Sequence, residues 1–68
     1  MVLTYINPTT LAETLDVSPL WVRDLLRANF HEQAPGKGGR WEVTHEMAML
    51  VAALVADWRL QQIDLLFS

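Results

Sequence analysis

The chain of 68 residues contains no cysteine. This excludes a disulfide framework and a thiolate zinc site, and it suits a reducing compartment, so we expect a cytoplasmic protein. The most apolar stretch, residues 47–56, is well short of the roughly 18 residues that a spanning helix needs. The N-terminus also lacks the basic and apolar regions of a signal peptide. The sequence therefore predicts no membrane partner and no processed leader.

Residues that could perform catalysis or bind a metal are also scarce. His31 and His45 stand alone, without a cysteine or a further histidine at ligand spacing. No Ser, His and Asp arrangement and no phosphate-binding glycine loop can be recognised, and a single domain of this length offers little concave space for a substrate. We therefore expect one domain with no enzyme activity, no cofactor and no metal.

Basic residues are few, but they are concentrated. Five Lys and Arg stand against eight Asp and Glu, which gives a net charge of -3. Residues 18–41 hold four of the basic and two of the acidic residues, so this segment sums to 4 - 2 = +2 and the remainder to 1 - 6 = -5. Modules that bind nucleic acids are more often basic overall, but segregated charge is what a one-sided binding face requires.

Residues 9–30 have the pattern of two helices joined by a tight turn. Thr10 and Glu13 form a capping box, which predicts the start of the first helix. Ser18-Pro19 predicts the start of the second, because serine accepts a free amide hydrogen bond and proline is preset for the first helical position. The turn at 16–17 is as short as the turns of DNA-reading helix pairs.

The flanking segments complete a small domain. Residues 1–8 are expected to be an arm or a short strand that ends at Asn7-Pro8. Residues 35–43 begin with a stretch rich in glycine and proline and end in a short apolar run, which predicts a β-hairpin wing. In residues 44–68 Thr44 can cap a third helix, whose apolar stripe from Met47 to Trp58 closes the core. Trp41 is also expected in the core.

The C-terminal tail, residues 60–67, does not continue this stripe cleanly, because Gln61 and Gln62 interrupt it. Exposed apolar patches are usually contact sites. The tail therefore either packs back over the first helix or pairs with a second copy or another protein.

The order of these elements resembles the MerR-like winged helix-turn-helix, which excisionases and phage small-terminase DNA-binding domains share. The resemblance covers residues 9–55 and is carried by LAETLDVSP at 11–19, WVRDLL at 21–26 and GRWEVT at 39–44. It implies a mainly α fold with three helices and a short hairpin wing. It also implies a protein that binds double-stranded DNA, as a transcriptional regulator or as an excisionase-like or packaging-like factor. The wing departs from the pattern by holding one arginine where relatives often have two.

The resemblance implies that Arg23 and Arg27 enter the major groove, while Lys37 and Arg40 contact the backbone or the minor groove. An arginine fork can donate two hydrogen bonds to guanine or to phosphate, and glycine lets a backbone approach a phosphate closely. The plainer alternative is a solvated helix face on which Arg27 pairs with an aspartate three residues earlier. Trp21 either is partly buried or contacts a partner. The candidate DNA-binding residues are Leu20, Trp21, Arg23, Arg27, Lys37 and Arg40.

A second class of function stays open. A domain of this fold could hold another protein through its acidic and apolar surface and not bind DNA, because function depends on the site and not on the fold.

Overall fold

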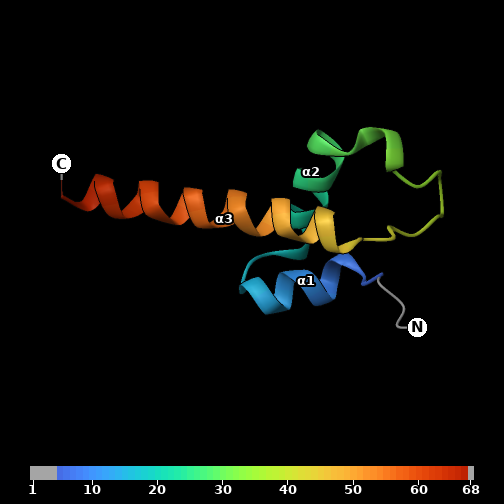
Figure 1. The fold of residues 1–68 in the computed structure, drawn as a ribbon, viewed down its shortest axis with the longest axis horizontal. Helices are drawn as coiled ribbons and strands as arrows, with labels where there is room; N and C mark the ends of the chain where they lie inside the picture. The colour runs from blue at the N-terminus through green and yellow to red at the C-terminus, as the bar shows by residue number, and fades with distance from the viewer. Residues whose placement is uncertain (1–4, 68) are drawn as a thin grey trace.

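The computed structural model describes residues 5–67 and is mainly α-helical, as predicted. Within these residues it contains three α-helices and a 3-10 helix, namely α1 (Pro8–Leu15), α2 (Pro19–Asn29), η1 (His31–Gln33) and α3 (His45–Leu66). α1 and α2 pack against each other, and α3 contacts both (Figure 1). An irregular connection from η1 leads back to the start of α3 at the end of the molecule where α1 begins.

α1 begins three residues earlier than the capping box predicts. Its N-cap is Asn7, whose side-chain oxygen accepts a hydrogen bond from the Thr10 amide at 2.7 Å. Pro8 occupies the first turn, where its fixed φ favours the helix and its missing N–H is not needed. The prediction is wrong because it treated Asn7-Pro8 as a break, whereas this pair starts the helix as Ser18-Pro19 starts α2.

The turn between α1 and α2 is closed by a residue in the left-handed conformation. Asp16 has a φ of 58°, and its amide donates to the carbonyls of Ala12 and Glu13. Aspartate is one of the few non-glycine residues that adopt this conformation readily. Ser18 then caps α2, accepting a hydrogen bond from the Leu20 amide at 3.2 Å, as the sequence predicts.

The core lies where the three helices meet. It contains residues from each of the three α-helices and two from the segment before α3: Leu11, Ala12, Val22, Leu26, Trp41, Val43, Met47, Val51 and Val55. The predicted core role of α3 is thus confirmed, as is that of Trp41. The prediction is wrong for Trp58, the last residue of the predicted stripe, because it is not in the core and 45% of its surface is exposed.

The predicted β-hairpin wing is not found in the described residues. Residues 34–42, the wing loop, are irregular, and their turn is closed by a hydrogen bond from the Gly39 amide to the Gly36 carbonyl at 2.8 Å. Val43 pairs instead with Ile6 in an isolated antiparallel bridge of two reciprocal hydrogen bonds, at 3.0 and 3.1 Å. A hairpin would need a strand before the turn, but Pro35 has no amide to donate and residues 31–33 are in η1. Of the predicted arm, residues 1–4 lie outside the described residues.

α3 extends well past the body that it forms with α1 and α2 (Figure 1). The whole molecule is 44 Å long on its longest axis. The predicted tail is therefore a continuation of this helix and does not pack back over α1. Near the edge of the body, Arg59 donates hydrogen bonds to the carbonyls of Leu15 and Asp16, at the C-terminal end of α1. Within residues 5–67, no helix has the length and apolarity that crossing a membrane requires.

The N-terminal cap of α3 should contribute measurably to stability. Thr44 accepts a hydrogen bond from the Met47 amide at 3.2 Å, so Thr44→Ala should lower the free energy of unfolding by about 1 kcal/mol in urea denaturation followed by circular dichroism. Thr14→Ala is the control, because the Thr14 hydroxyl lies inside α1 and donates to the Thr10 carbonyl without capping a helix. Equal effects of the two substitutions would contradict the role of the cap.

Candidate nucleic-acid interface

The outer side of α2 presents apolar and charged side chains to solvent. Val22 and Leu26 are fully buried in the core, and with 3.6 residues per turn they turn the other side of the helix outward. Leu20, Asp24 and Arg27 are exposed there, with 68% of the Leu20 surface accessible. This is the helix that the sequence predicts to read DNA.

Arg23 lies at the edge of this face, in a groove. Its side chain is half-buried, and its Nη2 donates to the Thr9 hydroxyl at 3.3 Å. The groove has a volume of about 320 Å³ and runs between the start of α1, α2 and the end of the wing loop. Arg40, at the end of the wing loop, also lines the groove, so two arginines contribute to it. We call it the basic groove, and it is lined by Asn7, Pro8, Thr9, Arg23, Gly39, Arg40 and Trp41.

The electrostatics of the basic groove favour an anion. No carboxylate is among its lining residues. It opens at the N-terminal end of α1, whose first turn has no acidic residue and where the aligned peptide dipoles place a partial positive charge. The Thr9 hydroxyl can accept from Arg23 and still donate to a bound oxygen. The groove can therefore offer a phosphate two charged forks and a neutral donor.

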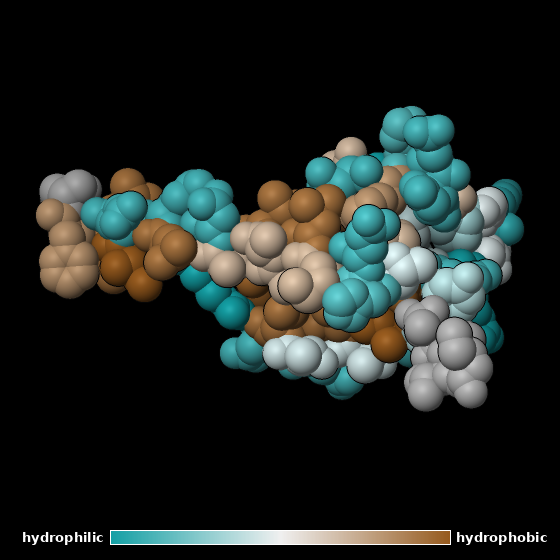
Figure 2. Space-filling model, in the orientation of Figure 1, coloured by the Kyte–Doolittle hydropathy of each residue, from teal (hydrophilic) through white to brown (hydrophobic). Residues whose placement is uncertain are grey.

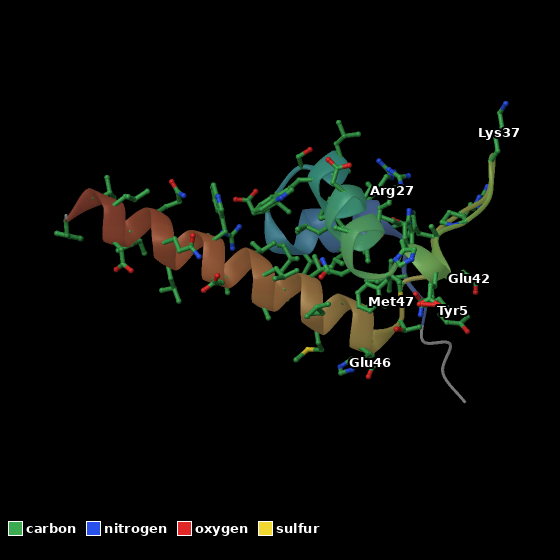
Figure 3. The ribbon with its side chains drawn as sticks, turned by 90° about the horizontal axis from the view of Figure 1, so that it is seen from above. Tyr5, Arg27, Lys37, Glu42, Glu46 and Met47 are labelled. Carbon is green, nitrogen blue, oxygen red and sulfur yellow. The ribbon has the colours of Figure 1, made fainter. Side chains whose placement is uncertain are left out.

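The other two predicted basic residues stand clear of the groove. Figure 3 shows Lys37 at the outer end of the wing loop, pointing away from the body, and Arg27 on α2 pointing to the same side. Among residues 5–67, neither side chain has an ion-pair partner, so the alternative in which Arg27 pairs with Asp24 is not what the structure shows. Both charges are available to a ligand.

Trp21 is not part of this surface. Its ring meets the ring of Trp58 edge to face, with the centroids 5.2 Å apart and the planes at 68°. This arrangement suits the charge distribution of aromatic rings and fixes α2 against α3. Trp21 is half-buried there, whereas its neighbour Leu20 is exposed on the outer side of α2.

Acidic residues bound the basic surface on one side. A larger, open groove of about 600 Å³ lies under the wing loop, where Glu42, Glu46 and Tyr5 join Arg40 in the lining (Figure 3). Arg40 thus marks the border between the two grooves. Within the described part of the chain, no three His, Asp or Glu residues lie close enough together to hold a metal ion.

Two residues of the basic groove were missed by the sequence analysis. Asn7 and Thr9 belong to the site because α1 begins at Pro8, and the recognisable signal was the Asn-Pro pair. The sequence also separates Arg23 from Arg40 by role, whereas the structure places both in one groove. Of the six predicted residues, the fold brings these two together, leaves Leu20, Arg27 and Lys37 exposed, and turns Trp21 toward α3.

Comparison with known proteins gives no match. The chain matches no protein-family model, no curated protein and no solved structure. The likeness to MerR-like domains therefore rests on the residues quoted above.

Proposed function

We propose that the protein binds double-stranded DNA as a small regulator or architectural factor of the excisionase or phage-packaging kind. α2 would lie in the major groove, and the wing loop would follow the backbone or the minor groove. The observation that carries this proposal is the basic groove at the start of α1, which Arg23 and Arg40 both line and which has no carboxylate among its lining residues.

A backbone phosphate is the anion that best suits this groove in such a complex. Guanidinium forks match phosphate oxygens in two-bond geometry, and helix N-termini favour them electrostatically. Such contacts set the position of a protein on the duplex and carry no sequence information themselves. We therefore assign Arg23 and Arg40 to the backbone, which moves Arg23 from the base-reading role that the sequence suggests.

Base reading is then left to the exposed side of α2. Arg27 can donate two hydrogen bonds to O6 and N7 of a guanine, and Leu20 can contact a thymine methyl group. Lys37 adds a point charge to the backbone contact from the wing loop. The net charge of -3 should keep affinity for arbitrary duplexes low, through a repulsion that salt screens. The phosphate contacts, in contrast, should make binding weaken as salt is raised.

The test is duplex binding by fluorescence anisotropy at increasing salt, starting at about 50 mM, where phosphate contacts are strong. We expect binding to a nonspecific duplex. Lys37→Gln should weaken it on every duplex and reduce the steepness of the log-log salt plot by about 0.9, the value for one lost phosphate contact. Glu13→Gln also changes the charge by one unit, at an exposed position of α1 that lines neither groove, so it should not make the slope less steep, with circular dichroism confirming that the variant is folded.

A wild-type chain that binds no duplex at this salt would contradict the proposal. The alternative is a protein-interaction module, which the exposed Leu20 and the acidic remainder of the chain favour. A partner protein would then bind the same face of α2. Leu20→Ala would abolish binding of that partner, whereas replacement of the basic residues would leave it unchanged.

A further inference from the structure

α3 carries a second apolar stripe on the side that faces away from the body. Successive members are four, three, four, three and four residues apart, which is the heptad spacing of coiled coils. All six are exposed, including Phe67 at 86%. We call this the outer stripe, and it consists of Met49, Ala53, Ala56, Leu60, Ile63 and Phe67.

The outer stripe is distinct from the stripe that forms the core. Met47, Val51 and Val55 face α1 and α2, and Met49 lies two residues after Met47, which is roughly 200° around the helix. The body of the molecule therefore does not cover the outer stripe. Figure 2 shows apolar side chains along the part of α3 that extends beyond the body.

We propose that the outer stripe binds a second copy of this chain, as a parallel, in-register coiled coil of two α3 helices. No charged residue interrupts the stripe from Met49 to Phe67. The alanines at 53 and 56 let the two backbones approach closely near the bodies, and the larger side chains that follow can interlock as knobs into holes. This inference concerns self-association and does not depend on DNA binding.

The charges that flank the outer stripe favour the parallel arrangement. Arg59 precedes one stripe position and Asp64 follows the next, so in a parallel pair Arg59 of one copy faces Asp64 of the other, twice by symmetry. In an antiparallel pair in which Ile63 of one copy faces Ala53 of the other, the flanking positions would place Asp57 beside Asp57 and Arg59 beside Arg59. Like charges in such positions are unfavourable. The Arg59 guanidinium, which bonds the end of α1 through Nη2, retains further donors for this contact.

The helix is short for a coiled coil, but half of it is already held in place. Isolated coiled coils usually need three to four heptads, because starting a helix is unfavourable. Here the core fixes α3 as far as Val55, so the projecting turns extend a preformed helix. The two bodies would lie on the outer sides of the pair, with both basic grooves at the same end.

Sedimentation equilibrium of the full chain tests the proposal. We expect a dimer at micromolar concentrations, and Ile63→Asp should raise the dissociation constant by roughly 100-fold or more, because it buries a charge in the seam. Leu65→Asp is the matched control, since Leu65 is 66% exposed but lies about 200° from Ile63 around α3. It should leave the mass unchanged. A wild-type monomer up to several hundred micromolar, or a dimer that survives Ile63→Asp, would overturn the proposal.

The absence of cysteine allows the orientation to be tested directly. In the parallel pair Ile63 faces itself, so Ile63→Cys should form a disulfide-linked dimer under mild oxidation. In the antiparallel pair Ile63 faces Ala53, so cross-links would form only when Ile63→Cys is mixed with Ala53→Cys. Cross-linking confined to that mixture would overturn the parallel arrangement.

Discussion

Leu26→Ala should largely unfold the protein. Leu26 has no exposed surface and is the largest side chain that is fully buried. Its truncation removes apolar contacts and leaves a cavity, which lowers the free energy of unfolding by about 2 to 5 kcal/mol. A domain of this size has roughly 3 to 10 kcal/mol in total, so the loss is a large part of its stability. Thermal unfolding followed by circular dichroism at 222 nm measures it.

The matched control for this prediction is Leu20→Ala, the same change six residues earlier on α2. Leu20 is exposed, and surface substitutions of this kind change stability by about 0.5 kcal/mol or less. Both variants retain the helix propensity of alanine, so any difference between them reports on packing. A Leu26→Ala variant that melts together with Leu20→Ala would show that α2 does not bury its inner side.

Removal of both guanidinium groups from the basic groove should abolish most of the salt-dependent binding. In Arg23→Gln with Arg40→Gln, two phosphate contacts are lost, so the slope of log affinity against log salt should become less steep by about 1.8, which is twice 0.9. Affinity should fall alike for every duplex, because these contacts carry no sequence information. Anisotropy titrations at several salt concentrations give both quantities.

Arg27→Gln separates base reading from this effect. It should lower the preference for a selected site by roughly 1 to 3 kcal/mol, since one bidentate base contact is lost, and leave the slope nearly unchanged. If the double variant instead lost only its preference for the selected site and kept the salt slope, Arg23 would contact the bases. The assignment of a phosphate to the basic groove would then be wrong.

Local signals in the sequence predicted the helices well. Ser18 and Thr44 cap α2 and α3 as expected, because a cap needs only the residue and the amides that follow it. The start of α1 was missed for a reason that is equally local. Asn7-Pro8 has two interpretations, as a break or as a start, and which one holds depends on whether the next turn has a core to pack on.

Contacts between distant segments could not be predicted in this way. The backbone partner of Val43 is Ile6, which lies before α1 in the sequence, and nothing in residues 35–43 indicates this pairing. The groove that Arg23 and Arg40 share likewise depends on distant segments, because α1 packs against α2 and the wing loop returns to the start of α1. For the tail, Gln61 and Gln62 do interrupt the core-facing stripe, but a second stripe continues on the outer side of the same helix. The prediction considered only the core-facing stripe of the helix and therefore missed the outer one.

The missing hairpin changes the thermodynamics of any contact made by the wing loop. A paired strand would hold Lys37 and Arg40 in place before binding, whereas here one turn hydrogen bond and the bridge at Val43 restrain the loop. Fixing the backbone of a free residue costs about 1 to 2 kcal/mol of conformational entropy, which is subtracted from the attraction of its charge for phosphate. Gly38 has a positive φ, which favours glycine, and a side chain at Gly39 would crowd Pro35. Gly36 has open space around it, so a side chain would fit there. In the proposed complex with DNA, the affinity of the loop would therefore depend on its glycines as well as on its cations.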